Sequence, residues 1–320
     1  MNVKNFADRV LENISRVIVG KDREIKLLLT SVIAGGHVLM EDVPGTGKTV
    51  MARSLASSIS CAFSRIQFTP DLLPGDITGL SVFDMKTSEF VFKPGPVFTN
   101  VLLADEINRA TPRTQSALLE CMEEKQVTMD GVTRPLPAPF LVIATQNPVE
   151  TQGTFPLPEA QLDRFLMKLG LGRLSHDEAV SVLRRFQKND PLAELESVCT
   201  AQDILDAREA CKDCEVSEPV MDYIASLCQN THAAPNVVLG VSPRGMLALM
   251  RACRAWALIE GRDFVTPDDV KALAVPVLAH RVAVKNAYGE TAASENAVKA
   301  ALEATEVPTE DVKNRETDEE

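Results

Sequence analysis

Residues 42–49 of the chain read Asp42-Val43-Pro44-Gly45-Thr46-Gly47-Lys48-Thr49. The apolar run Val38-Leu39-Met40 precedes them, and a helical pattern over residues 50–57 follows. A glycine-rich loop in this strand–turn–helix context is typical of a phosphate site. Gly45 and Gly47 leave room for main-chain N–H groups to converge on phosphate oxygens, and the helix start adds a favourable dipole. The stretch therefore predicts an α/β domain that binds a phosphorylated ligand.

The residue types within this loop predict specific roles. Lys48 is expected to reach the β- and γ-phosphates of a nucleoside triphosphate, and Thr49 to ligate Mg²⁺. The usual pattern begins with glycine where this chain has Asp42, but that first position is the least involved with phosphate. We therefore interpret the segment as a variant phosphate loop. The alternative, a chance glycine turn, is disfavoured because Gly-Lys-Thr lies between a strand and a helix.

A second apolar run, over residues 101–104, ends in two acids, Asp105 and Glu106. Ligands bind at the carboxyl ends of the strands of an α/β sheet. Asp105 is expected to hold Mg²⁺ through water, and Glu106 to orient and polarise an attacking water. An apolar run before two acids is a weak signal alone, and the phosphate loop upstream strengthens it.

A third apolar run, over residues 141–144, is followed by Thr145-Gln146-Asn147-Pro148. Continuous apolar runs of this length are typical of parallel strands that helices cover on both faces. The Asn147 amide could hold a γ-phosphate or the attacking water. The alternative, that Asn147 and Pro148 only turn the chain, stays open.

The second half of the chain, from about Leu174, loses the strand signals and becomes helical. Helix starts are predicted at four capping residues: Ser175, Ser217, Ser242 and Thr266. We expect an α/β domain over residues 1–172 and a helical domain over residues 173–302. The acidic tail, residues 303–320, is expected to be disordered because it has few large apolar side chains.

Two arginines are candidate cations for phosphate, one just before this boundary and one within the helical domain. Arg164 lies in Gln161-Leu162-Asp163-Arg164-Phe165, and Arg244 lies in the first helical turn after Ser242-Pro243. An arginine supplied across a subunit interface accelerates phosphoryl transfer, and Arg164 could act in this way. Either arginine taken alone would be an ordinary surface residue.

The composition limits the classes of partner. The 320 residues carry a net charge of −12, which argues against duplex nucleic acid as the main partner. No apolar run approaches the roughly 20 residues that a membrane span needs, and no signal peptide is recognisable, so a cytoplasmic location is expected. The seven cysteines, with one Cys211-x-x-Cys214 pair, and the four histidines lack the spacing of a zinc site.

In order and separation these segments resemble the MoxR family of the AAA+ superfamily, over roughly residues 17–281. Such an ordered set is more specific than any single motif. The matching stretches are Val17-Ile18-Val19-Gly20, residues 41–49, Leu103-Ala104-Asp105-Glu106-Ile107-Asn108-Arg109-Ala110, Ala144-Thr145-Gln146-Asn147-Pro148, residues 157–165 and Ser242-Pro243-Arg244.

This resemblance implies a fold and residue roles. The fold is an α/β P-loop AAA+ core, a parallel sheet flanked by helices, followed by an all-α lid domain. By resemblance, Lys48 and Thr49 belong to Walker A, Asp105 and Glu106 to Walker B, Asn147 is sensor 1, Arg164 the arginine finger and Arg244 sensor 2. Metal ligands would be Thr49 and Asp105. The implied nucleotide contacts are Val19, Gly20, Val43, Pro44, Gly45, Thr46, Gly47, Lys48, Thr49, Val50, Asp105, Asn147 and Arg244.

The resemblance also implies how the protein acts. ATP and Mg²⁺ would be its cofactors, and a homo-oligomeric ring, a hexamer, would hydrolyse ATP to remodel, mature or insert a cofactor into a client, together with a partner that contains a von Willebrand factor A domain. Two inserted hairpins, over residues 79–97 and 126–137, would face the pore or the client. Gly75 stands where serine is expected. Whether Arg244 serves its own nucleotide or a neighbour's stays open.

Two other functions remain open from the sequence. A metal-chelatase or nucleic-acid motor subunit has a similar core, but the predicted hairpins contain only Lys86, Lys93 and Arg134 as basic residues, which disfavours a DNA motor. The other function is a nucleotide-gated binding module that switches without significant turnover. The presence of every catalytic residue type does not exclude it.

Overall fold

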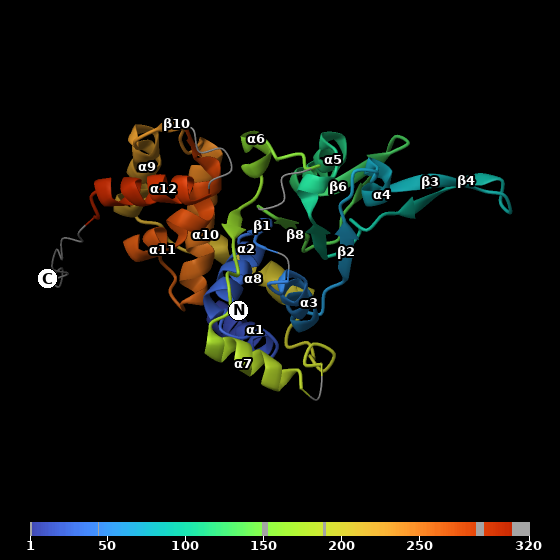
Figure 1. Cartoon of the computed structure of the whole chain (residues 1–320), viewed down its shortest axis with the longest axis horizontal. Helices are drawn as coiled ribbons and strands as arrows, with labels where there is room; N and C mark the ends of the chain where they lie inside the picture. The colour runs from blue at the N-terminus through green and yellow to red at the C-terminus, as the bar shows by residue number, and fades with distance from the viewer. Residues whose placement is uncertain (1, 44, 149–152, 188–189, 286–290, 309–320) are drawn as a thin grey trace, which may run out of the picture.

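The computed structural model describes residues 2–43, 45–148, 153–187, 190–285 and 291–308 (Figure 1). At its centre lies a parallel sheet with the strand order β2-β5-β8-β1-β9. Its strands are β1 (Val38–Glu41), β2 (Phe63–Gln67), β5 (Val101–Asp105), β8 (Leu141–Gln146) and β9 (Met167–Leu169). The three predicted strands are confirmed, and each extends one or two residues past its apolar run.

The central strands are buried on both faces, which explains their continuous apolar sequences. Along β1, Val38 and Met40 point into one hydrophobic core and Leu39 points into the other. The first core also contains side chains of α1 (Val3–Ser15), α2 (Asp22–Ile33) and α3 (Lys48–Ser58). The second contains side chains of α4 (Pro74–Thr78) and α5 (Pro112–Glu124).

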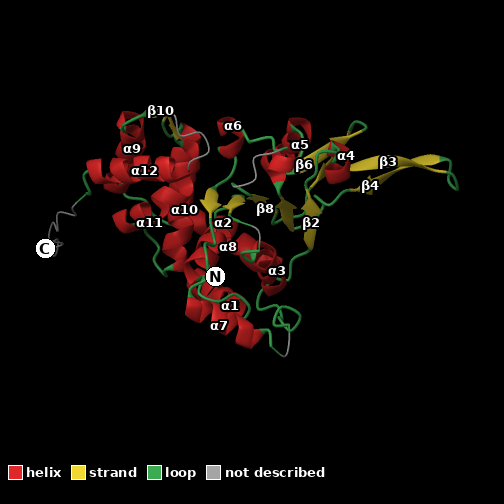
Figure 2. Ribbon diagram, in the orientation of Figure 1, coloured by secondary structure: helices red, strands yellow, loops and turns green. Residues whose placement is uncertain are grey.

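The second half of the chain is helical, as predicted (Figure 2). Helix α6 (Glu159–Leu162) still precedes β9, and the later helices are α7 (His176–Arg185), α8 (Ala201–Asp213), α9 (Glu218–Ala233), α10 (Pro243–Ile259), α11 (Pro267–Leu278) and α12 (Thr291–Ala304). All four predicted capping residues occupy helix N-caps, and Ser175, Ser242 and Thr266 accept hydrogen bonds there. One detail differs from the expectation of an all-α region, because β10 (Val237–Leu239) pairs with β11 (Ala283–Val284).

The first hydrophobic core continues from the sheet into this helical region. Side chains of α8 and α10 belong to the same buried cluster as those of α1 and α2. The predicted division at residue 172 falls between β9 and α7, and it stays a prediction. Helix α12 runs to Ala304, two residues into the predicted tail, and residues 309–320 lie outside the described part of the chain.

Both predicted hairpins are present. β3 (Gly79–Asp84) pairs with β4 (Glu89–Pro94) and extends away from the rest of the molecule (Figure 1). β6 (Gln126–Met129) pairs with β7 (Val132–Pro135), and the turn between them uses positive φ at Asp130 and Gly131. Within the described residues, no helix is both long and apolar enough to cross a membrane.

Candidate nucleotide site

The phosphate loop connects the end of β1 to the start of α3. Gly45 and Gly47 have φ of 85° and 95°, in the left-handed region that favours glycine. A Cβ built on either glycine would meet no atom within 4 Å, so the space beside the loop is open. Gly47 caps α3 without a side-chain acceptor, which leaves N–H groups of the first helical turn for an anion. Pro44 lies outside the described residues.

Lys48 begins α3 and turns back over the loop. Its Nζ donates to the main-chain oxygen of Asp42 at 2.7 Å. Burial lowers the pKa of Lys48, and the carboxylates of Asp42, Asp105 and Glu106 oppose that shift. The ammonium group is thus within electrostatic reach of both acids that were predicted to lie beside it.

Asp105 ends β5 and Glu106 follows it, and hydrogen bonds hold both acids in place. Asp105 accepts a hydrogen bond from the Thr145 hydroxyl at 2.6 Å on one oxygen and one from Arg65 Nη2 at 2.6 Å on the other. The Glu106 carboxylate accepts from Gln67 Nε2 at 2.8 Å, and its ion pair with Arg109 measures 3.1 Å. Both carboxylates therefore have fixed positions at the edge of the sheet.

Thr145 connects the two acids through one hydroxyl group. Its Oγ1 donates to Asp105 and accepts from the main-chain N–H of Glu106 at 2.9 Å. Glu106 has φ of 55°, a left-handed conformation that is uncommon for a residue other than glycine. Such a conformation at a site of this kind is held by its surroundings, and here the Thr145 hydroxyl supplies part of that restraint.

Sequence reasoning missed Arg65 and Gln67, which come from β2. They alternate with Ile66 along the strand, so both side chains lie on one face. In the sheet Gln67 is in register with Asp105. The alternation was visible in the sequence, but the adjacency of β2 to β5 was not.

Asn147 directly follows β8, between the strands that carry the phosphate loop and the two acids. It therefore lies at the same carboxyl edge of the sheet as Lys48 and Asp105. The predicted adenine-side segment, residues 17–20, packs against the beginning of α7. Gly20 has φ of 68°, in the left-handed region that favours glycine, and a Cβ there would lie 1.8 Å from an oxygen of the Glu178 side chain.

Arg164 lies at the opposite edge of the sheet. Leu166 N–H donates to the carbonyl oxygen of His37 at 2.8 Å, and Met167 is in register with Val38, the first residue of β1. Arg164 therefore precedes the strands, whereas the phosphate loop follows them. A strand rises about 3.3 Å per residue, so the length of β1 separates Arg164 from the loop. In Figure 1, α6 lies above the sheet and α3 lies below it.

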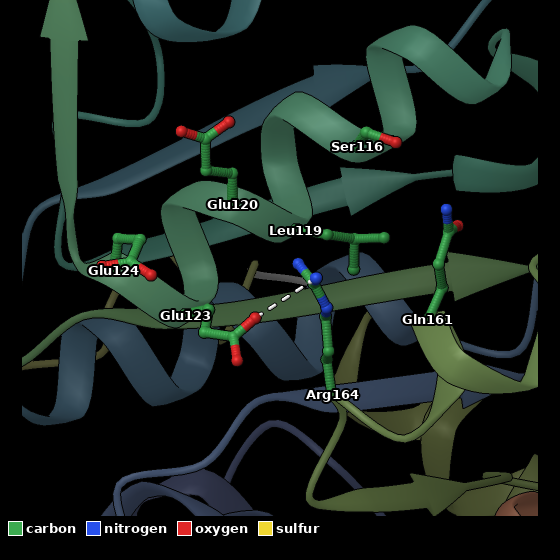
Figure 3. A pocket seen from close by; sticks show the side chains of 7 residues that line it. All are labelled: Ser116, Leu119, Glu120, Glu123, Glu124, Gln161 and Arg164. Carbon is green, nitrogen blue, oxygen red and sulfur yellow. Dashed lines mark ion pairs between the residues drawn. The ribbon is translucent and has the colours of Figure 1, made fainter.

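Arg164 and Arg244 share one partner, Glu123 near the end of α5. The Arg164 and Arg244 guanidinium groups lie 3.3 Å and 2.7 Å from separate oxygens of Glu123. Figure 3 shows Arg164 directed at Glu123 in a pocket that is also lined by Glu120 and Glu124. The structure thus brings the two predicted arginines together, but away from Lys48 and the two acids. Glu123 carried no signal in the sequence.

The segment that carries Arg164 is attached to the helical region through its neighbour Asp163. Buried Arg281, which follows α11, forms an ion pair with Asp163 at 2.7 Å and donates to the carbonyl oxygen of Phe165 at 2.6 Å. The Ser242 hydroxyl donates to the other Asp163 oxygen at 3.2 Å. Arg281, like Arg65, Gln67 and Glu123, was assigned no role by sequence reasoning.

The residues present fit a magnesium ion held together with phosphates. Mg²⁺ takes oxygen ligands, usually one or two carboxylates with phosphate oxygens and water. Thr49 in the first turn of α3 and Asp105 at the end of β5 provide such oxygens at the same edge of the sheet. Within the described residues, no group of three or more His, Cys, Asp or Glu side chains forms an all-protein metal cage. A metal at this edge would therefore rely on ligand oxygens.

The fold and this site define a P-loop protein of the AAA class. The profile of the ATPase family associated with various cellular activities (AAA) matches residues 37–167, and that of the AAA lid domain matches residues 229–313. The chain is 41% identical to chaperone MoxR1 of Mycobacterium tuberculosis, over 86% of this chain and 75% of that protein. It belongs to the MoxR family of AAA+ ATPases.

Other relatives agree with this assignment. The uncharacterized protein YeaC of Bacillus subtilis is 50% identical, over 94% of both chains. The crystal structure of a proposed ATPase from Cytophaga hutchinsonii superposes with a TM-score of 0.88, at 38% identity and over 96% of both chains. The expected fold, a P-loop AAA+ core followed by a helical lid, is confirmed.

Proposed function

We propose that this protein binds Mg·ATP at the carboxyl edge of its sheet and hydrolyses it. The observation that carries the proposal is that Lys48, at the end of an open glycine loop after β1, lies at the same carboxyl edge of the sheet as Asp105 and Glu106. One cation for phosphate and two acids for metal and water are the groups that phosphoryl transfer to water requires.

Each residue has a role that its position supports. Main-chain N–H groups of the loop and Lys48 bind the phosphates, Thr49 and Asp105 hold the metal, and Glu106 orients the attacking water. Mg²⁺, when bound, neutralises charge on the phosphate oxygens. Asn147, at the end of the strand between the two halves of the site, contacts the γ-phosphate or that water. Val19, Gly20, Val43 and Val50 line the nucleotide on its other sides.

We further propose that Arg164 and Arg244 act on the nucleotide of a neighbouring subunit. Both lie at the amino edge of the sheet, at least the length of a strand from their own phosphate loop, and an arginine side chain does not span that distance. A closed ring, such as a hexamer, brings the amino edge of one subunit to the carboxyl edge of the next by repeating one heterologous contact. This arrangement makes hydrolysis depend on assembly.

The energy of hydrolysis is proposed to drive remodelling or maturation of a client protein. The β3–β4 hairpin supports this because Phe83, Met85 and Phe90 are exposed on an element that extends from the body. Exposed apolar groups of this kind mark interaction surfaces. The relative in Mycobacterium tuberculosis carries the name chaperone. Cofactor insertion and a partner with a von Willebrand factor A domain remain finer proposals.

Steady-state ATPase measurements on the wild type and Glu106→Gln test the proposal. The wild type is expected to hydrolyse ATP in the presence of Mg²⁺, and Glu106→Gln to bind Mg·ATP but turn over at least about a hundredfold more slowly. A nucleotide switch without significant turnover would give equal rates for the two proteins. The same variant, used as bait with ATP present, is expected to retain client proteins that the wild type releases.

A further inference from the structure

The carboxylate of Asp42, which stands in place of the first glycine of the phosphate loop, binds the chain beyond β9. One of its oxygens accepts from the main-chain N–H groups of Leu171 and Gly172, each at 2.8 Å. The other accepts from the N–H of Val43 at 3.0 Å. These three donors offset the cost of a negative charge beside a phosphate site.

Leu171 and Gly172 belong to the short connection between β9 and α7, through which the sheet continues into the helical region. The Leu171 side chain is buried in the hydrophobic core, and Gly172 has φ of 65°, so the path of the main chain is fixed here. The Asp42 carboxylate thus hydrogen-bonds the connection at the two residues where core packing and a left-handed glycine fix its path.

The main-chain oxygen of Asp42 contacts Lys48, the residue expected to bind phosphate. Lys48 Nζ donates to the Asp42 carbonyl oxygen in this structure. When Lys48 binds a β- or γ-phosphate, its three N–H donors must be shared between that oxygen and the phosphate. One residue therefore contacts both the group that responds to nucleotide and the connection to the helical region.

The preceding residue, Glu41, makes a similar contact to a later part of the chain. Its carboxylate forms an ion pair with Lys168 of β9 and accepts hydrogen bonds from Gln146 and from Thr291, the first residue of α12. Gln146 directly precedes Asn147. Glu41 and the first residue of the loop, Asp42, thus both contact segments that lead into the helical region.

We propose that Asp42 is a positioning residue that couples occupancy of the phosphate loop to the position of the β9–α7 connection. This inference rests on the proposed function, because it requires phosphate to bind Lys48. Glycine at this position would leave phosphate binding intact but would remove the coupling. The departure from the usual loop sequence would then be the means by which nucleotide state reaches the helical region.

Amide hydrogen exchange at Leu171 and Gly172 tests the proposal. Asp42→Gly is expected to bind Mg·ATP within about threefold of the wild-type affinity, and to exchange these two amides about tenfold faster or more, because each loses a charged acceptor. In the wild type the exchange rates of these amides are expected to change when a non-hydrolysable ATP analogue binds. In Asp42→Gly that change is expected to be absent, with kcat lowered more than KM is raised.

Lys21→Ala is the matched control. Lys21 Nζ donates to the main-chain oxygen of Arg173, the next residue of the same connection, at 3.3 Å. This variant removes a neighbouring contact, and it is expected to leave exchange at Leu171 and Gly172 unchanged. Asp42→Asn keeps one acceptor oxygen. The exchange rates of the Leu171 and Gly172 amides in this variant are therefore expected to lie between the rates in Asp42→Gly and in the wild type. If Asp42→Gly fails to show cooperative unfolding and is therefore misfolded, amide exchange at Leu171 and Gly172 in Asp42→Asn decides the test instead.

The outcomes separate the two proposals. If the amides of residues 171–172 exchange at equal rates in the wild type and in the Asp42 variants, the assigned contact is overturned. This criterion applies both with and without nucleotide. A wild type that binds Mg·ATP but shows no change in exchange at these amides would overturn the coupling and leave the proposed function intact. A wild type with no affinity for Mg·ATP would overturn the proposed function, and the coupling with it.

Discussion

Lys48 and Arg164 lie at opposite edges of the same parallel sheet, Lys48 after β1 ends and Arg164 before β9 begins. Because β1 and β9 are adjacent and parallel, no movement of side chains alone can bring these two residues to one phosphate. A site that uses both groups must therefore be formed by two copies of the chain.

Mixing two inactive variants tests that requirement. Arg164→Ala is expected to bind ATP normally and to lose turnover by about a thousandfold, the range of other arginine fingers. Lys48→Ala is expected to lose ATP binding. In mixed rings, the intact loop of one variant meets the intact arginine of the other, so ATPase activity should return in part. Mixtures with no more activity than the separate variants would contradict a role in trans.

Thr145→Val is expected to impair catalysis because the change removes the hydroxyl and keeps the shape. Asp105 would lose a donor, and the Glu106 N–H would lose its acceptor, at a cost of about 1–3 kcal/mol in unfolding free energy. We expect kcat to fall at least about tenfold, with Mg·ATP affinity changed less. Thr145→Ser retains the hydroxyl and should restore most of kcat. Similar kcat values for Thr145→Val and Thr145→Ser would show that the hydroxyl does not position the two acids for catalysis.

Arg281 pairs with Asp163, and Glu123 pairs with the neighbouring Arg164. Arg281 is buried, whereas Glu123 is partly exposed. Replacing Arg281 by alanine leaves Asp163 without its buried partner, which typically costs about 3–5 kcal/mol. Glu123→Gln affects pairs that are partly exposed, which are worth about 1 kcal/mol or less. Urea unfolding of the two variants checks the contrast. Equal losses of unfolding free energy would show that the burial of Arg281 has no energetic consequence.

The burial of His37 is expected to make the free energy of unfolding depend on pH. Its Nδ1 accepts from Val142 N–H at 2.9 Å, so Nε2 carries the proton that is donated to the Met122 oxygen. Burial lowers its pKa from 6.5 to about 4. Between these values the unfolded chain binds a proton that the folded chain excludes. Stability is therefore full above pH 6.5 and falls toward pH 4, by about 3 kcal/mol from this residue at about 1.4 kcal/mol per unit.

Denaturant titrations of the wild type and His37→Gln over this pH range measure the effect. Burial also lowers the pKa of His280, so the wild type should lose stability from both residues. The variant should keep only the contribution of His280 and show a shallower pH dependence. Parallel curves for the two proteins would show that His37 does not exclude the proton.

The parts of the fold that were predictable are those with local signals. β1, β5 and β8 are buried on both faces and so appear as apolar runs, and the capping residues Ser175 and Thr266 lie next to the helices that they begin. β2 was harder to see because it is an edge strand with polar side chains on one face, and β9 has only three residues.

The parts of the site that were not predictable depend on contacts between distant residues. Asp42 was recognisable as a departure from the loop pattern, but its partners Leu171 and Gly172 lie about 130 residues further along the chain. Glu123 meets Arg244 across 121 residues, so their contact depends on the tertiary fold that brings the end of α5 to the start of α10. Sequence periodicity and motif spacing do not predict contacts between residues so far apart.

The attachment of Asp163 to Arg281 and Ser242 has a consequence for motion. Since both of these residues belong to the helical region, a rotation of that region carries the Arg164 segment with it. Withdrawal of an arginine from one active site in a ring would then follow directly from a change of shape in the subunit that donates it. In the proposed ring, hydrolysis at one site would thereby depend on the conformation of the neighbouring subunit.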